Sequence, residues 1–481
     1  MPNDALTPAP ALDAGAPAEE SSRERYRGLI WLVSAAFFMQ ALDSTIVNTA
    51  VPAMAGALGV TPLGMRSALT SYVLTLAILI PASPWLCDRF GTRRVFGAAI
   101  AVFGIGSLLC GVSQTLPQLV AARVMQGVGG AALMPVGRYV LVRSIAKREF
   151  VAVMSTVATF GLLGSVLGPL LGGALVEFTT WRLIFLINVP VGLAGMWMNK
   201  QDMPDYRLQH ANRFDLLGFL LFGTASALLL TASELVGAEH VVWARIGECT
   251  ALALLIGVIY VWHSRRTTFP VADLSLLKVR SVWVALAGNL FTRLGISGMF
   301  LLLVLFLQVG CGWSALMAGL MMVPQALGSI SAKWLVNRVL AWLGYRRLLI
   351  GNTLVVAVLL ASFATFGRDT PAWLIAVMVF LYGGFGGLQY TAMNTLVYHD
   401  LDIRHASMAS SMASTAQYLS MSFGIALATL LMESLLQGHA HSDYVAAFRW
   451  TVLILAAVTA SASRVFGRLR VDRPVRQGAA A

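Results

Sequence analysis

Charged residues are scarce in this chain. Only 12% of its 481 residues are charged, 58% are hydrophobic, and the mean hydropathy is +0.75. An ordinary soluble domain carries about 25% charged residues, so this composition excludes that class of protein. The apolar residues gather in runs that are long enough to cross a bilayer. We therefore predict an all-α polytopic membrane protein, with the lipid bilayer as its surroundings.

Cysteine is scarce as well. The four cysteines, Cys87, Cys110, Cys249 and Cys311, lie in or beside apolar runs, and none has the paired spacing of a metal-binding or redox motif. The chain also has no phosphate-binding glycine loop and no nucleophile elbow. We therefore expect no metal, no cofactor, no ATP and no enzymatic activity, so that any transport draws on an ion gradient or runs downhill.

About fourteen apolar runs have the length of a membrane span. They begin near Leu29, Ser67, Val95, Leu119, Val151, Leu183, Leu216, Ile246, Val282, Ala315, Leu348, Trp373, Met408 and Val445. Basic residues gather in alternate connections, and basic loops stay in the cytoplasm, which predicts that both termini are cytoplasmic. This pattern also explains the net charge of +12, so nucleic acid is not an expected partner.

An internal sequence repeat indicates that the chain has two related halves. Residues 85–94 resemble residues 334–347, and repeats of this kind build transporters. The predicted organisation is a disordered cytoplasmic tail (1–27), an N-terminal six-helix bundle (28–200), a linker with an inserted transmembrane hairpin (201–281), a C-terminal six-helix bundle (282–466) and a basic cytoplasmic tail (467–481).

Asp43 lies about fourteen residues into the first run and therefore near the middle of the bilayer. A charged carboxylate at this depth costs roughly 2.5–3.5 kcal/mol on insertion scales, so such groups normally face a wet cavity. Arg123 enters the fourth run from the opposite side and reaches a matching depth, which allows an ion pair. Gln40, Ser44 and Asn48 recur every four residues and form a polar stripe beside Asp43.

Several strings in a fixed order resemble the fourteen-span drug:proton antiporter branch of the major facilitator superfamily. They occupy residues 42–52, 86–94, 123–130, 161–173 and 181–190. The resemblance implies the major facilitator fold, with two six-helix bundles, an inserted two-helix hairpin and 14 transmembrane helices. It further implies a proton-coupled exporter of drugs or metabolites that works by alternating access. Abundant Arg, Ala and Gly beside scarce Lys indicate a bacterial source, and we expect the plasma membrane because no other targeting signal is found.

Two of these strings have a physical meaning of their own. A glycine stripe in the fifth run lets another helix approach closely, and the resemblance links it to antiport. It consists of Gly161, Gly164, Gly168, Pro169, Gly172 and Gly173.

The loop after the second run is expected to be a gate, because its carboxylate can meet Arg side chains or a helix start in one conformation. It contains Asp88, Arg89, Gly91 and Arg93, and Pro84 stands where the family has glycine. The alternative for the glycine stripe is a packing groove without a role in antiport, and the alternative for the loop is a solvated turn.

We hypothesise that Asp43 binds and releases the coupling proton. Arg123 would stabilise the charged carboxylate in one conformation and release it in another. The alternative is a static buried pair that fixes packing.

A second intramembrane cation, Arg293, lies near the midplane of the ninth run, where no further carboxylate is found. The predicted substrate cavity consists of Gln40, Ser44, Asn48, Asn289, Arg293 and Gln417. Its net positive charge favours neutral or anionic compounds, unless Arg293 interacts with backbone carbonyls or helix dipoles instead.

Other functions stay open from the sequence. The chain could export organic anions or their chelates, import a solute together with protons, or act as a receptor without transport, because fold alone does not set function or direction. A receptor would tolerate loss of Asp43 and show no flux. Protons and a small-molecule substrate are the expected partners, and any envelope partner is unknown from the sequence.

Overall fold

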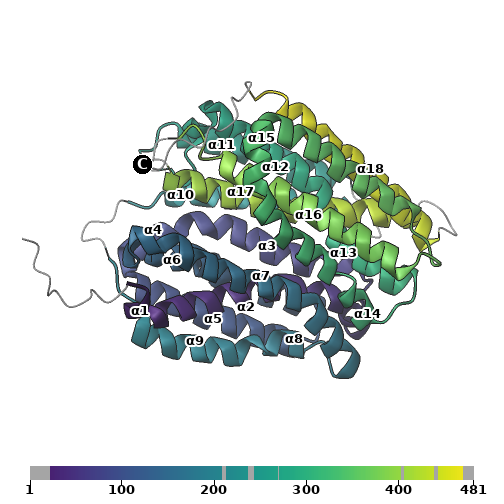
Figure 1. Ribbon diagram of the computed structural model, residues 1–481, viewed down its shortest axis with the longest axis horizontal. Coiled ribbons are helices and arrows are strands. Elements are labelled where there is room, and N and C mark those ends of the chain that lie inside the picture. Colours follow the sequence, from purple (N-terminus) through teal and green to yellow (C-terminus); the bar gives the residue numbers. More distant parts are fainter. Residues whose placement is uncertain are drawn as a thin grey trace, which may run out of the picture.

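The computed structural model describes residues 22–207, 213–236, 243–268, 270–401, 406–437 and 443–469. Regular structure within these ranges is entirely helical, which confirms the predicted fold class. Figure 1 shows the purple and blue helices α2 to α9 in one half of the molecule and most of the green and yellow helices in the other. The predicted tails fall largely outside the described residues, so their disorder stays a prediction.

The first bundle contains nine helices and two short 3₁₀ turns. They are α1 (Ser22–Arg25), α2 (Arg27–Leu58), η1 (Leu63–Met65), α3 (Arg66–Leu79), η2 (Ile80–Ala82), α4 (Ser83–Phe90), α5 (Thr92–Val112), α6 (Leu116–Ser144), α7 (Lys147–Phe178), α8 (Leu183–Leu186) and α9 (Asn188–Asp202). The predicted hairpin follows as α10 (Leu216–Val236) and α11 (Trp243–Ser264).

The second bundle begins after the short helix η3 (Leu274–Lys278). Its elements are α12 (Arg280–Ile296), α13 (Met299–Leu305), η4 (Phe306–Gly310), α14 (Ala315–Leu320), α15 (Val323–Ser362), η5 (Phe363–Thr365), α16 (Ala372–Leu396), α17 (Ala406–Gln437) and α18 (Tyr444–Phe466).

Thirteen continuous helical stretches of the described chain are long and apolar enough to cross a membrane, and one of them holds two crossings. The stretch Ala315–Thr365 has 51 residues, or about 77 Å of helix, more than twice the apolar thickness of a bilayer. Gly344 breaks it with a φ of 71° and a ψ of 167°, in the left-handed region that glycine tolerates. The predicted fourteen crossings are therefore present.

Two prolines shape the second crossing. Pro81 lies in η2, and Pro84 lies in the first turn of α4, where the missing N–H costs no helical hydrogen bond. The neighbouring Ser83 hydroxyl donates to the Ala131 carbonyl at 3.0 Å. The end of this crossing thus packs against α6 although Pro84 replaces the glycine that the family has there.

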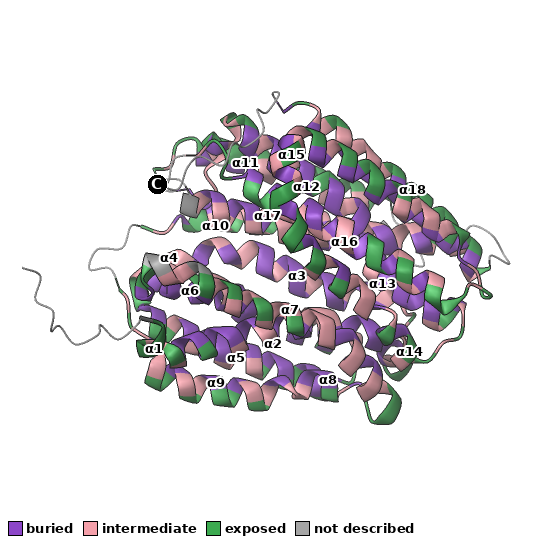
Figure 2. Cartoon of the chain, viewed as in Figure 1, coloured by how far each residue is buried: buried purple, intermediate pink, exposed green. Residues whose placement is uncertain are grey.

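The hairpin α10–α11 presents apolar side chains outward. Leu254, Leu255 and Val258 of α11 are more than half exposed, as are Leu216 and Leu220 of α10. Figure 2 shows exposed residues on the outer faces of the helices and buried residues between them. Helices that are long enough to span a membrane and apolar on their outer faces are suited to contact lipid.

The two bundles meet more extensively on one side of the membrane than on the other. We call the side that carries the basic connections the basic side, and the other the opposite side. On the opposite side, one hydrophobic cluster contains buried residues from both bundles, such as Ile46 and Leu305. On the basic side, each bundle has a buried cluster of its own, although Tyr418 of α17 still contacts the first bundle. The two bundles therefore contact each other mainly on the opposite side.

The glycine stripe lies against α2, the helix that carries Asp43. A Cβ atom added to Gly164 would lie 2.5 Å from the Phe38 carbonyl oxygen, and one added to Gly168 would overlap the Thr45 hydroxyl. Gly172 is equally close to Thr49. The absence of side chains lets the two helices touch through their backbones, as predicted for small residues in a membrane.

We expect Gly168→Val to lower the stability of the protein by about 1–3 kcal/mol, because the new side chain has no space against α2. Gly351→Val is the matched control, since a Cβ atom there meets nothing within 4 Å. Thermal unfolding of both variants in the same detergent is the measurement. Equal melting temperatures would contradict the close packing of α7 on α2.

Candidate functional site

Asp43 is completely buried, and three side chains donate hydrogen bonds to its carboxylate. Arg123 Nη1 donates to Oδ2 at 2.8 Å. Gln126 Nε2 and Asn188 Nδ2 both donate to Oδ1, at 2.7 and 3.2 Å. A carboxylate with three donors, one of them a guanidinium, is well satisfied in its charged form. The ion pair between Asp43 and Arg123, which their similar predicted depths in the membrane allowed, is therefore present.

Gln126 and Asn188 link this pair to the surrounding helices. The Gln126 side chain accepts from Arg123 Nη1 at 2.6 Å and donates to the Ser107 hydroxyl at 2.8 Å, while Asn188 Nδ2 lies 3.5 Å from the same hydroxyl. Sequence reasoning assigned no role to either residue. Gln126 follows Arg123 by three residues and so shares its helical face, which is a signal that could have found it.

Arg123 connects Asp43 with the central cavity. Its guanidinium carbon lies 4.1 Å from the centre of the Tyr72 ring, and its Nε donates to the Ala68 carbonyl at 3.3 Å. Arg123 and Tyr72 both line the cavity between the bundles, whereas Asp43 does not. Arg123 therefore contacts both the cavity and the Asp43 carboxylate, which itself lies outside the cavity lining.

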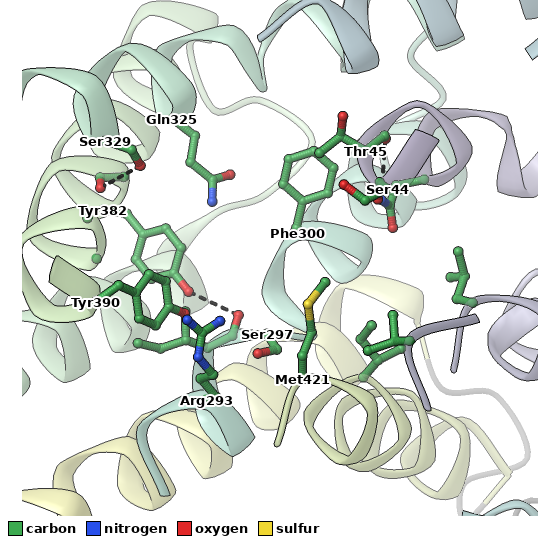
Figure 3. Close-up of a pocket in the computed structure, with 18 of the residues that line it drawn as sticks. Ser44, Thr45, Arg293, Ser297, Phe300, Gln325, Ser329, Tyr382, Tyr390 and Met421 are labelled. Carbon is green, nitrogen blue, oxygen red and sulfur yellow. Dashed lines mark hydrogen bonds between the residues drawn. The ribbon is translucent and has the colours of Figure 1, made fainter. Parts of the chain in front are cut away.

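The cavity has a volume of about 210 Å³ and takes residues from both bundles. Figure 3 shows Arg293, Tyr382 and Tyr390 on one side and Ser44 and Thr45 on the other, with Phe300 and Met421 between them. Of the six residues predicted for the substrate cavity, three line it. These are Ser44, Asn48 and Arg293.

The other three predicted cavity residues lie outside its lining. Gln40 is buried, and its Oε1 has no hydrogen-bond partner. Asn289 is buried and accepts from Arg293 Nε at 2.6 Å, which places it behind the arginine. Gln417 is half-buried on α17. Helical spacing alone could not distinguish a polar residue on the cavity wall from one a turn behind it.

Arg293 is a buried cation beside the cavity, with only 7% of its surface exposed. Its guanidinium carbon lies 4.0 Å from the centre of the Tyr390 ring. Its only hydrogen-bond partner among the described residues is the Asn289 side chain, and no carboxylate of the described chain lies within ion-pair distance of it. Backbone carbonyls of the described chain therefore do not hold this arginine, but Arg293 lies in the last turn of α12, near the negative end of the helix dipole.

The predicted gating loop packs onto the segment after α9. Arg93 Nε donates to the Met203 carbonyl at 2.6 Å, and the Arg93 backbone N–H donates to Asp205 Oδ1 at 3.2 Å. Gly91 has a φ of 89° and lies so close to Asp205 that a Cβ atom would overlap its carboxylate. All these contacts stay within the first half of the chain.

Asp88 has a partner of a different kind from the expected one. Its Oδ1 accepts from the Tyr139 hydroxyl of α6 at 3.0 Å, whereas we expected an Arg side chain or a helix start. Arg89 is exposed. The gating role of this loop stays a prediction.

The glycine stripe also reaches the second half of the chain. A Cβ atom on Gly173 would lie 2.5 Å from the Ala315 carbonyl oxygen, and Gly319 of α14 lies directly against Pro169. Glu177 near the end of α7 accepts from the Leu316 N–H at 3.1 Å. One helix, α7, thus touches both the helix of Asp43 and the second bundle.

An ion pair joins the bundles on the opposite side. Arg66 Nη1 contacts Glu433 Oε2, and their side chains are 7% and 16% exposed. Among the described residues, no other ion pair connects a helix of the first bundle with a helix of the second. Gln308 Nε2 adds a hydrogen bond to the Thr49 carbonyl at 3.0 Å.

Comparison with known proteins identifies the class. Residues 33–425 match the family model described as Major Facilitator Superfamily, and the chain belongs to this family of transporters. It is 40% identical over 454 residues to a protein of Cronobacter sakazakii (strain ATCC BAA-894), covering 93% of this chain and 96% of the relative. It is 41% identical over 450 residues to one of Serratia proteamaculans (strain 568), covering 92% and 93%. Both relatives are named "Putative multidrug resistance protein MdtD".

Solved structures agree on the fold. A D-xylose-proton symporter superposes with a TM-score of 0.66 at 13% identity, covering 92% of this chain and 97% of the symporter. An inward-facing, unoccupied bacterial homolog of the human lysosomal transporter Spinster superposes with a TM-score of 0.64 at 14% identity, covering 94% and 98%. At these identities, the likeness concerns the fold alone.

We expect Asp43→Asn to destabilise the protein by about 3–5 kcal/mol, because Arg123 would remain buried without its counter-ion. The double variant Asp43→Asn/Arg123→Gln should lose less than the sum of the two single variants, because it leaves no unpaired charge. Thermal unfolding of the three variants forms the test. Additive losses would show that the pair contributes no coupling.

Proposed function

We propose that this protein is a proton-coupled antiporter that exports small molecules, drugs or metabolites, by alternating access. The observation that carries the proposal is the fully buried Asp43, held by Arg123 at the edge of the central cavity. The names of the relatives support multidrug substrates. The protein would act in a bacterial inner membrane, with the basic side and both termini in the cytoplasm, and not as an enzyme.

On this proposal the structure corresponds to the cytoplasm-facing state after proton release. Solute from the cytoplasm enters the cavity and meets Arg123 and Arg293. The bundles then part on the opposite side and the solute leaves. A proton from outside neutralises Asp43, which frees Arg123 from its ion pair and permits the return. Re-formation of the pair with Arg123 expels the proton to the cytoplasm.

The α7 helix supplies a mechanical link for this cycle. Its glycine stripe touches α2 at Gly164, Gly168 and Gly172, while Gly173 touches α14 of the second bundle. A shift of α2 that accompanies protonation of Asp43 is therefore transmitted to the contact between the bundles. This link accounts for the glycine motif better than a passive packing groove would.

Asp43→Asn should abolish uphill export under an imposed proton gradient while downhill solute exchange continues, because the amide cannot gain and lose the coupling proton. Purified protein in proteoliposomes, tested with solutes of either charge such as ethidium and benzenesulfonate, gives the measurement. Uphill export by this variant would exclude Asp43 as the coupling site. Protons that move in the same direction as the solute in the wild type would indicate symport.

The Arg66–Glu433 pair should stabilise the cytoplasm-facing state, because it joins α3 to α17 where the bundles are closed. Glu433→Gln is expected to raise the population of the outward-facing state about 5- to 30-fold, which corresponds to about 1–2 kcal/mol. Spin-label distances across the opposite side report this population. Arg368→Gln is the matched control, since its pair with Asp443 is exposed and lies within the second bundle. An equal shift in both variants would contradict the proposed closure.

A further inference from the structure

The cavity carries an unneutralised positive charge. Two arginines, Arg123 and Arg293, line it, and no acidic residue of the described part of the chain does. Asp43 neutralises Arg123 from behind, at 2.8 Å. Among the described residues, the Arg293 guanidinium contacts the neutral Asn289 and the Tyr390 ring and has no carboxylate as an ion-pair partner. A buried guanidinium without a counter-ion is costly, and a ligand carboxylate in the cavity would remove that cost.

A second donor stands beside Arg293. Ser297 follows it by four residues and so lies on the same helical face at the end of α12. The Ser297 hydroxyl is buried, lines the cavity and has no hydrogen-bond partner. The Nη atoms of Arg293 and the Ser297 hydroxyl have no acceptor among the described residues, and these donors on one face match the two oxygens of a carboxylate.

Aromatic side chains form part of the cavity wall around Arg293. Phe300, Tyr382 and Tyr390 line the cavity around Arg293, and Tyr72 lines it from the first bundle. Figure 3 shows the guanidinium of Arg293 beside the rings of Tyr382 and Tyr390, with Phe300 across from them. Aromatic rings pack well against a flat ring of the ligand. The volume of about 210 Å³ is somewhat larger than the roughly 150 Å³ of an apolar cavity that binds benzene, which suits a compound with one ring.

We propose that the preferred substrates are small aromatic carboxylates, with the carboxylate bound by Arg293 and Ser297 and the ring packed among Phe300, Tyr382 and Tyr390. This inference rests on the proposed function and specifies its substrate. Asn289 positions Arg293 through the 2.6 Å hydrogen bond and does not itself line the cavity.

The charges in the cavity then predict that the membrane potential helps to drive transport. With the anion bound and Asp43 ionised, the charges of the two arginines, the aspartate and the ligand sum to zero. After release and protonation of Asp43, two positive charges remain. One cycle with one proton therefore moves two positive charges inward, and an inside-negative membrane potential drives it. Exchange of a monovalent cation for one proton would move no net charge.

The first test is equilibrium binding of labelled benzoate to purified protein at neutral pH, with benzylammonium and citrate as competitors. Benzoate should bind saturably, and both competitors should be weaker by about tenfold or more, since one lacks the negative charge and the other the ring. Arg293→Gln should weaken benzoate binding by about tenfold or more. Arg449→Gln is the matched control, because Arg449 is exposed and bonds only the Phe366 carbonyl.

A second variant keeps the test decisive if Arg293→Gln does not fold. Asn289→Asp places a carboxylate on Arg293 from behind, so benzoate binding should fall about tenfold or more while benzylammonium binding is kept or improved. Unchanged benzoate affinity in folded Arg293→Gln or Asn289→Asp protein would overturn the proposal, as would a wild type that prefers benzylammonium or citrate.

Transport measurements distinguish a failure of this substrate inference from a failure of the proposed function. Benzenesulfonate stays ionised, and its export from proteoliposomes should accelerate when an inside-negative potential is imposed. Proton-coupled export of ethidium without export of benzenesulfonate would overturn the substrate inference and leave antiport standing. No coupled proton movement with any solute would overturn the proposed function, whatever the binding results.

Discussion

The architecture around the candidate site depends on keeping one negative charge stable inside a membrane. Asp43 has no exposed surface, and a carboxylate there must be matched by donors or lose its charge. Two helices supply those donors to the carboxylate on α2: α6 carries Arg123 and Gln126, and α9 carries Asn188. The first bundle thus places hydrogen-bond donors around the Asp43 carboxylate. Protonation of Asp43 would remove the negative charge that these donors stabilise.

Coupling between solute and proton can pass through a single side chain. Arg123 lies between Asp43 and the cavity, with the Tyr72 ring under its guanidinium. On the proposed mechanism, any event that draws Arg123 toward the cavity would weaken its contact with Asp43, and protonation of Asp43 would free Arg123 in turn. Because α7 touches both α2 and α14 through its glycines, the same event would also reach the second bundle.

The fold and the main charged pair were predictable from the sequence for simple reasons. Span length, basic loops and the depth of Asp43 and Arg123 follow from counting residues along straight helices. The break at Gly344 fits two spans that are too long to be one. The polar stripe was predicted only in part, because Ser44 and Asn48 face the cavity and Gln40 does not.

Contacts between distant parts of the chain were not predictable in this way. Gln126 and Asn188 meet at Asp43 because α6 and α9 converge there, and the pair Arg66–Glu433 joins residues 367 positions apart. The Tyr139 partner of Asp88 depends on how α6 packs beside α4. Each of these requires the relative placement of helices, which residue spacing along one helix does not contain.

Proton exchange by the purified protein tests the central claim most directly. In weakly buffered detergent solution, addition of a transported solute to the wild type should release or take up protons in proportion to the protein present. The same addition to Asp43→Asn protein should change the solution pH no more than a buffer blank. Proton exchange of equal size in the variant would contradict the claim that Asp43 carries the coupling proton.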